Sequence, residues 1–153
     1  MDLNESSGNR ESTGREYPER PYASVAACVF KDNKVLLIKR AKPPSQGRWS
    51  VPGGMIELGE TLEDAARREL EEEGGIEIKT GRIFNVENLI VPDGDGKVLF
   101  HYVVTYLTAY YRSGTIRPGS DELDICWAAR DELPQFDMSP VVRKNMTAAF
   151  NYR

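Results

Sequence analysis

Histidine, cysteine and long apolar segments are scarce in this sequence of 153 residues, and each scarcity excludes a class of protein. The single histidine, His101, excludes a metal centre built from several histidines and a hydrolytic triad built around any other histidine. The two cysteines, Cys28 and Cys126, form no CxxC pair and lie in apolar, strand-like runs, which predicts buried free thiols and a cytoplasmic location. No apolar run approaches the ~20 residues of a membrane helix, so no membrane partner is expected.

Positive charge is also in short supply. The 20 lysines and arginines are outnumbered by 24 acidic residues, which gives a formal net charge of −4. Proteins that neutralise nucleic-acid phosphates need clustered basic residues, so nucleic acid is not an expected partner. The hydrophobic fraction of 40% and the charged fraction of 29% are typical of an ordinary globular protein.

The length and the character of the N-terminus predict one domain that follows a tail. Residues 1–20, MDLNESSGNRESTGREYPER, mix both signs of charge and lack the apolar centre of a signal peptide. We expect a flexible tail at 1–20 and a single domain at 21–153, which is close to the commonest domain size.

The rest of the chain alternates strand-like runs with two helical segments. Apolar runs at 22–30 and 34–41 flank Asp32 and Asn33, which predicts a hairpin. Longer runs at 76–91 and 97–111 are joined by the turn sequence PDGDG, and a shorter run follows at 123–129. Ser139 and Pro140 are typical of a helix start. The pattern predicts an α/β protein with a mixed sheet and helices packed on it.

The most unusual segment is an acidic helix predicted at 62–73. Thr61 and Asp64 resemble a capping box, and the pair Gly74–Gly75 marks the end. At ~100° per residue, several acidic residues lie on the same side of this helix as Arg67 and can pair with it. We expect that side to be solvated. The opposite, core-facing stripe carries three further acids: Glu69, Glu72 and Glu73.

Three carboxylates on a core-facing stripe require a positive partner. Residues spaced i, i+3 and i+4 lie about 5–6 Å apart, so the three charges repel one another, and partial burial raises the cost of ionising them. A hard divalent cation, Mg²⁺ or alternatively Mn²⁺, fits best because such ions prefer oxygen ligands and retain sites for water and phosphate. Arg68, next to Glu69, is placed to orient part of this cluster.

The segment 54–76 resembles the Nudix box, in which a glycine, a glutamate, an Arg-Glu pair, a Glu-Glu pair and a final glycine recur at fixed spacings. All nine motif positions are filled, by Gly54, Glu60, Arg68, Glu69, Leu70, Glu72, Glu73, Gly75 and Ile76. The preceding RWSVPGG is also typical of the family. The resemblance implies a Nudix-type α/β/α sandwich that contains a mixed β-sheet and the box helix. It also implies hydrolysis of a nucleoside diphosphate linked to another group.

The resemblance implies a role for each matching residue. Glu69, Glu72 and Glu73 would ligate the metal together with the backbone carbonyl of Gly54, and Glu60 would support Arg68. The catalytic set would therefore include Glu69, Glu73 and Arg68.

Family members differ in the identity of the general base, which can lie outside the box. Glu122 is our candidate for that base or for an extra ligand, with Asp121 second. A solvated loop acid is an equally good interpretation of Glu122.

The substrate is less well defined. Within the family, a proline about sixteen positions beyond the box is associated with ADP-ribose hydrolysis, and Pro92 lies sixteen after Ile76. Pro92 also opens the PDGDG turn, where a proline is ordinary. ADP-ribose or a related nucleotide sugar is the first hypothesis. The alternatives are a mutator-type nucleoside triphosphate pyrophosphohydrolase, which includes action on oxidised nucleotides, and a nucleotide-sensing module without catalysis.

Five further residues are candidates for substrate binding. Arg40 and Arg48 are placed to clamp phosphates, although surface arginines are common. Trp49, Phe84 and Tyr102 are candidates for stacking on a nucleobase, with core packing as the alternative for each. The expected partner is a small-molecule nucleotide, and the protein is expected to be a monomer or a homodimer.

Overall fold

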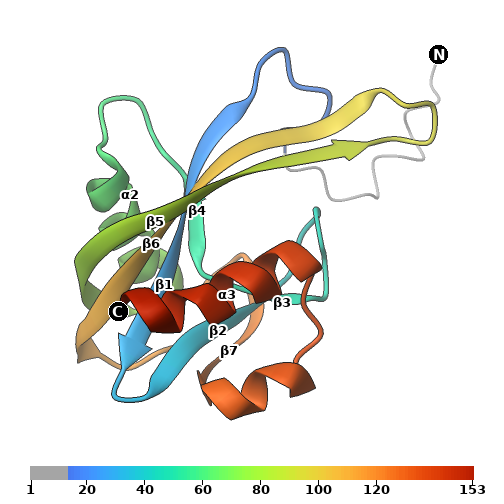
Figure 1. Cartoon of the computed structure of the whole chain (residues 1–153). Helices are drawn as coiled ribbons and strands as arrows, with labels where there is room; N and C mark the ends of the chain where they lie inside the picture. Colours follow the sequence, from blue (N-terminus) through green and yellow to red (C-terminus); the bar gives the residue numbers. More distant parts are fainter. Residues whose placement is uncertain (1–13) are drawn as a thin grey trace.

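The computed structural model (Figure 1) describes residues 14–153, which contain seven strands. The strands are β1 (Tyr22–Lys31), β2 (Lys34–Arg40), β3 (Trp49–Ser50), β4 (Gly53–Met55), β5 (Ile76–Pro92), β6 (Val98–Gly114) and β7 (Glu122–Ala129). The helices are α2 (Leu62–Glu69), its wider continuation η1 (Leu70–Gly74), the short η2 (Arg130–Gln135) and α3 (Pro140–Tyr152).

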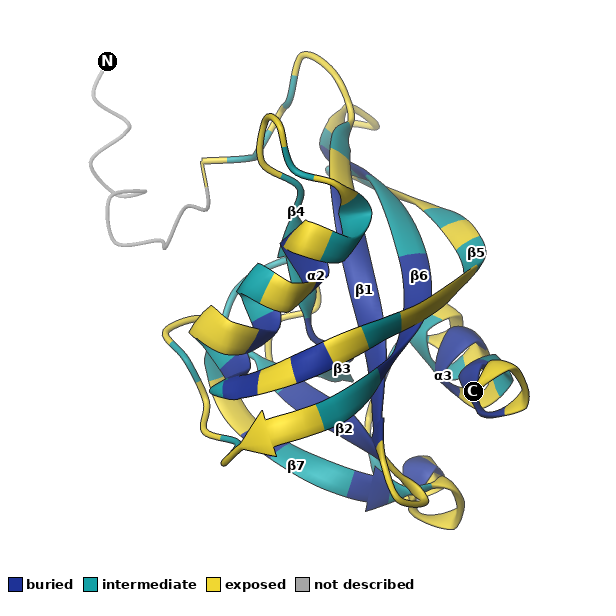
Figure 2. Cartoon of the chain, turned by 90° about the vertical axis from the view of Figure 1, so that its left-hand side faces the viewer, coloured by how far each residue is buried: buried dark blue, intermediate teal, exposed yellow. Residues whose placement is uncertain are grey.

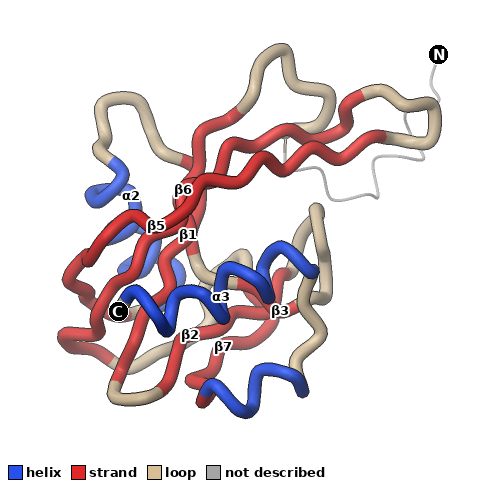
Figure 3. The backbone as a smooth tube through the Cα atoms, viewed as in Figure 1, coloured by secondary structure: helices blue, strands red, loops and turns tan. Residues whose placement is uncertain are grey.

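The strands form one mixed sheet, as the sequence predicts. The order is β3-β2-β1-β6-β5, with β4 paired to β1 and β7 paired to β2. The β1–β6 pair is parallel and the other pairs are antiparallel. The long β5–β6 hairpin extends well beyond the body of the molecule in Figure 3.

Helices α2 and α3 lie on different sides of the central strands, as Figure 2 shows. Strand β1 is buried on both faces, and its alternating side chains explain why two cores form. Val25, Ala27 and Val29 belong to the core beneath α2, whereas Cys28 and Phe30 belong to the core beneath α3. This layered arrangement confirms the predicted α/β sandwich.

Most predicted elements are confirmed, and two short strands were missed. The hairpin at Asp32 is present, with Phe30 opposite Val35, and Ser139 caps α3 by accepting a hydrogen bond from the Val142 amide. Strands β3 and β4 contain two and three residues. Runs this short carry no periodic signal, and the Gly53–Gly54 pair in β4 argues against a strand. Pairing with β2 and β1 therefore holds these residues extended.

The acidic helix begins as predicted and ends in a wider turn. The Asp64 amide donates to Thr61 Oγ1 at 3.1 Å, and Gly75 closes the helix in the left-handed conformation with a φ of 76°. From Leu70 the helix widens to a π-type turn, which advances each residue by less than ~100°. This rotates Glu72 further from the core. The prediction of a core-facing position is therefore wrong for Glu72, whose side chain is 59% exposed.

The start of α2 offers a stability test. We expect Thr61→Ala to lower the free energy of unfolding by about 1 kcal/mol, because the Asp64 amide loses its capping acceptor. Thr61→Ser keeps a hydroxyl and serves as the control. Urea unfolding followed by circular dichroism measures both. Equal stability of Thr61→Ala and the wild type would contradict the capping role.

The two cysteines agree with their sequence prediction in part, and the start of the described chain contacts the domain. Cys28 and Cys126 are free thiols as predicted, although only Cys28 is fully buried. No helix within residues 14–153 is long and apolar enough to cross a membrane. Of the predicted tail, residues 1–13 lie outside the described residues. Residues 14–20 reach the β5–β6 hairpin, where the Tyr17 amide donates to the Leu99 carbonyl and its hydroxyl to Asp93 Oδ2.

Candidate active site

Arg68 joins α2 to the loop and strand that precede it. Its Nε and Nη2 donate to the two carboxylate oxygens of Glu60 at 2.7 and 2.8 Å, a bidentate pair of the strongest type. The same Nη2 also donates to the Met55 carbonyl at 3.0 Å, and Nη1 donates to Glu69 Oε1 at 3.0 Å. The Arg68 guanidinium therefore holds the Met55 carbonyl of β4, the Glu60 carboxylate of the loop and the Glu69 carboxylate of α2 in fixed positions relative to one another.

Glu60 remains ionised in this arrangement. The hydrogen bonds from Arg68 and, next, from the Glu57 amide lower the pKa of Glu60 to about 2. The same pairing raises the pKa of Arg68. Glu60 thus acts as the counter-ion that orients Arg68 toward Glu69, which is the arrangement that the sequence resemblance implies.

Glu69 is largely enclosed, with a side chain only 16% exposed. Burial raises its pKa first of all, and the charges of Glu73 and Glu72 add to this, while the hydrogen bond from Arg68 opposes it. Gly54 lies directly against the Glu69 carboxylate, so a Cβ at position 54 would overlap the carboxylate oxygens. A glycine is therefore needed where the backbone passes this closely.

Glu73 and Glu122 come together although they are distant in sequence. Glu122 begins β7, lies close enough to Glu73 for the two carboxylates to interact, and accepts a hydrogen bond from the Gly119 amide at 2.9 Å. Burial, followed by the charge of Glu73, raises the pKa of Glu122. Ser120 Oγ lies 3.3 Å from Glu73 Oε1, which leaves Oε2 buried and without a hydrogen-bond partner among the described residues. The loop before β7 thus adds a carboxylate to the helical acids.

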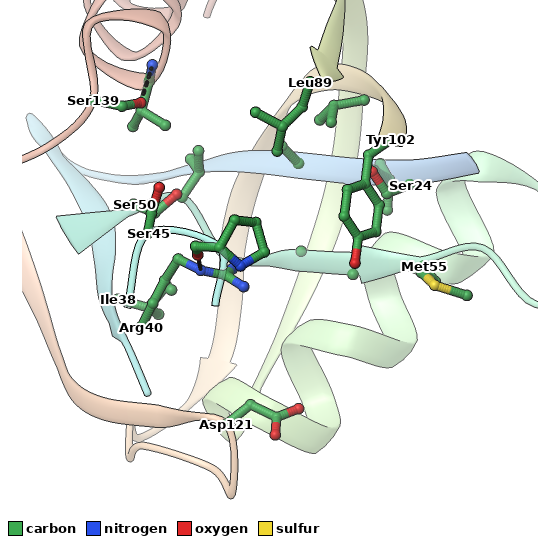
Figure 4. A pocket seen from close by; sticks show the side chains of 18 of the residues that line it. Ser24, Ile38, Arg40, Ser45, Ser50, Met55, Leu89, Tyr102, Asp121 and Ser139 are labelled. Carbon is green, nitrogen blue, oxygen red and sulfur yellow. Dashed lines mark hydrogen bonds between the residues drawn. The ribbon is translucent and has the colours of Figure 1, made fainter. Parts of the chain in front are cut away.

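These acids border a pocket of about 290 Å³. The predicted residues that line it are Gly54, Glu69, Glu73, Glu122, Arg40, Trp49 and Tyr102. In Figure 4, Arg40 and Tyr102 flank the centre of this pocket and Asp121 lies at its lower end. Arg40 is held there because its Nε donates to the Pro44 carbonyl at 2.7 Å.

Other predicted residues are not brought to the pocket. Arg48 forms an ion pair with Asp137 at 3.6 Å, and the Phe84 ring stacks on Tyr152 with centroids 5.3 Å apart. Glu72 lies outside the pocket lining, where Arg68 Nη1 approaches it at 3.5 Å. Arg68 and Glu60 sit behind the lining acids rather than among them.

Pro92, the residue that suggested a substrate, is exposed at the end of β5 and does not line the pocket. Three charged lining residues were missed by sequence reasoning: Arg15, Lys42 and Glu87. Arg15 lies in the segment taken for a tail, and Lys42 pairs with Asp121 at 3.2 Å. For Glu87 the strand alternation that places it on the same face as Leu89 was a usable signal.

The acids fit a divalent cation in part. Glu73 Oε2, which is buried and has no partner in the described part of the chain, and the enclosed Glu69 carboxylate are oxygen ligands that lack sufficient positive charge. Across residues 14–153, no three acidic side chains form a ready cation site, and Glu72 does not line the pocket that Glu69 and Glu73 border. Glu69 and Glu73 would therefore hold the ion. It would supply neutralisation of phosphate charge and stabilisation of a leaving phosphate.

The comparisons with known proteins agree with this geometry. The family model described as NUDIX domain matches residues 20–150. The chain therefore belongs to the Nudix hydrolase family, whose members are pyrophosphohydrolases.

Three similar proteins illustrate the range of the family. An ADP-ribose pyrophosphatase of Methanocaldococcus jannaschii is 33% identical over 128 residues, which cover 82% of this chain and 73% of the relative. A putative 8-oxo-dGTP diphosphatase 2 of Mycobacterium tuberculosis is 34% identical over 122 residues, covering 78% and 81%. The crystal structure of a MutT NUDIX hydrolase from Burkholderia pseudomallei aligns with a TM-score of 0.72 at 31% identity, covering 84% and 97%.

Proposed function

We propose that this protein hydrolyses a phosphoanhydride in a nucleoside diphosphate linked to another group, with Mg²⁺ as the cofactor and Mn²⁺ as a possible substitute. ADP-ribose or a related nucleotide sugar is the preferred substrate, and a nucleoside monophosphate is one product. The observation that carries the proposal is the pocket in which Glu69, Glu73 and Glu122 face the same space as Arg40. The similarity to the archaeal ADP-ribose pyrophosphatase supports the choice of substrate.

We assign the side chains roles that their positions support. Glu69 and Glu73 hold the cation with the Gly54 carbonyl, and Glu72 is assigned as a further ligand by the motif alone. Arg68 positions Glu69, and Arg40 binds phosphate oxygens. Since Glu122 has a raised pKa and lies beside Glu73, it is suited to accept the proton of the attacking water.

A mutator-type nucleoside triphosphate pyrophosphohydrolase is the second candidate. The mycobacterial relative named as a putative 8-oxo-dGTP diphosphatase favours it, at an identity similar to that of the archaeal protein. The two candidates share the acidic cluster and differ in what the rest of the pocket accepts.

The proposal includes a cellular location, a partner and an oligomeric state. We place the protein in the cytoplasm because Cys28 and Cys126 are free thiols. Its partner is a small-molecule nucleotide, without nucleic acid or membrane, and it acts as a monomer or a homodimer.

Product analysis by chromatography tests the proposal. The protein is incubated with Mg²⁺ and, separately, with ADP-ribose, other nucleotide sugars, and common and oxidised nucleoside triphosphates. We expect AMP and ribose 5-phosphate from ADP-ribose. A nucleoside monophosphate and pyrophosphate from a triphosphate would support the second candidate instead. No turnover of any compound would contradict both and favour a sensing module.

A further inference from the structure

The pocket contains a carboxylate that the acidic cluster does not explain. Glu87 lies on β5, outside the Nudix box, and it lines the pocket together with residues of β6 and α3. Its side chain is 18% exposed, so it is largely enclosed. An enclosed carboxylate normally satisfies both of its oxygens within the protein.

Only one oxygen of Glu87 is satisfied in this way. Oε2 accepts hydrogen bonds from Asn85 Nδ2 at 2.9 Å and from Asn145 Nδ2 at 2.7 Å, and Lys144 Nζ lies 2.9 Å away. Within residues 14–153, no donor reaches Oε1. The one buried side-chain polar atom without a partner in that range is Glu73 Oε2, so Glu87 Oε1 is not fully buried, and Glu87 is one of the residues that line the pocket.

The donors are themselves fixed. Asn145 on α3 is only 1% exposed, its Nδ2 also donates to the Val141 carbonyl at 2.9 Å, and its Oδ1 accepts from Asn85 Nδ2 at 2.7 Å. This network ties β5 to α3 and sets the direction of the Glu87 carboxylate. The bonds from Asn145 and Lys144 also lower the pKa of Glu87, so the group is ionised at neutral pH.

Glu87 occupies a part of the pocket separate from the acidic loop. Successive side chains of a strand alternate, so Glu87 faces the same side as Leu89, directly across from Val104. In Figure 4, Leu89 and Ser139 lie at the opposite end of the view from Asp121, with Arg40 between them. The walls near Glu87 are mostly apolar and come from both layers: Leu89, Val104, Tyr106, Val141 and Val142.

We propose that Glu87 Oε1 accepts a hydrogen bond from the nucleoside half of the substrate and thereby determines specificity. The inference rests on the proposed function, since it assumes that the phosphates occupy the end of the pocket near Arg40. An apolar wall with one oriented acceptor suits a flat base edge or a ribose edge that presents a donor. The donor is an N–H of the base or an O–H of the ribose.

Glu87→Gln is a sharp test because of the fixed donors. Three donors require an oxygen at the Oε2 position, so the amide nitrogen of the glutamine is placed at the Oε1 position. The acceptor that faces the pocket becomes a donor with little change in shape. Glu77→Gln, the same substitution at an exposed position of β5 outside the pocket lining, is the matched control.

The measurement is calorimetric binding of AMP without divalent cations, which does not depend on hydrolysis. We expect Glu87→Gln to weaken AMP binding at least ~10-fold, since hydrogen bonds to charged groups are among the stronger ones. Glu77→Gln is expected to bind like the wild type. Thermal unfolding of both variants shows whether the hydrogen-bond network between β5 and α3 is intact.

Three AMP analogues identify the donor. If the donor is the 6-amino group, the wild type binds the purine analogue that lacks this group at least ~10-fold more weakly than AMP. If it is a ribose hydroxyl, the 2′-deoxy or the 3′-deoxy analogue shows that loss. In either case we expect the Glu87→Gln variant to bind AMP and that analogue with nearly equal affinity, so that the ratio of the two dissociation constants is close to one.

Two results would overturn the assignment of Glu87. One is an equal loss, or no loss, of affinity for AMP and all analogues in Glu87→Gln, because a purely structural role predicts no selectivity. The other is failure of the wild type to bind AMP. The proposed function fails separately, if AMP binds with these ratios but no nucleotide is hydrolysed.

Discussion

Glu73→Gln is expected to reduce hydrolysis at least ~100-fold while the fold is retained. The substitution replaces a charged oxygen ligand with a neutral amide at the position whose Oε2 is buried and has no hydrogen-bond partner within residues 14–153. Loss of one cation ligand removes several kcal/mol of transition-state stabilisation, and ~100-fold corresponds to about 2.7 kcal/mol. The measurement is the steady-state rate with the substrate identified by product analysis, over a range of Mg²⁺ concentrations.

A neighbouring acid provides the control for this substitution. Glu71 lies two residues earlier in the same turn, and its side chain is exposed to solvent. Glu71→Gln removes the same charge from the same helix and is expected to keep nearly full activity. Full activity of a correctly folded Glu73→Gln would contradict the assignment of the cation site.

Gly119→Ala is expected to reduce kcat at least ~10-fold, although it removes no functional group. A Cβ at position 119 would overlap Glu73 Oε2 and approach the Glu73 backbone, so either the carboxylate or the loop must move. Both movements separate Glu73 from Glu122, whose Oε1 accepts from the Gly119 amide. Displacements of about 1 Å at a catalytic centre can cost ~100-fold, so a ~10-fold loss is a modest expectation.

The matched control for this change is Gly94→Ala in the β5–β6 turn. Apart from its two chain neighbours, no residue of the described part of the chain comes within 4 Å of a Cβ placed at Gly94, and neither Gly94 nor Gly119 has a positive φ. Both alanines are therefore compatible with the backbone, and they differ in what the new methyl group meets. The two variants are compared by kcat and by thermal unfolding. A rate for Gly119→Ala that equals the rate for Gly94→Ala would show that the loop tolerates displacement.

The local part of the fold was predictable from the sequence, whereas the long-range part was not. The box helix has explicit start and stop residues, Thr61 and Gly75, and its motif identified Arg68 and the helical acids. The parallel pairing of β1 with β6 joins residues about 80 positions apart, such as Tyr22 and Tyr102, and no pattern within either strand specifies that partner. Glu122 was a candidate by its loop position, and only the tertiary structure brings it to Glu73.

One prediction error and one open alternative have local physical causes. The ideal helical wheel placed Glu72 on the inner face, but the π-type turn from Leu70 rotates it outward. Phe84 was a candidate for stacking on a nucleobase with core packing as the alternative, and its ring packs against Tyr152 of α3, as strand aromatics usually do. Neither the widening of a helical turn nor the partner of an aromatic ring is encoded by spacing.

The contacts of residues 14–20 with the β5–β6 hairpin affect where an N-terminal truncation of this protein can be made. A version that begins at residue 21, where the sequence suggests that the domain starts, would keep the strands and helices described for residues 14–153. It would lose Tyr17, which bonds to Leu99 and Asp93, and with it Arg15, which borders the pocket. In such a trimmed protein the pocket would lose the positive charge of Arg15, so its affinity for anionic compounds would not represent that of the full chain.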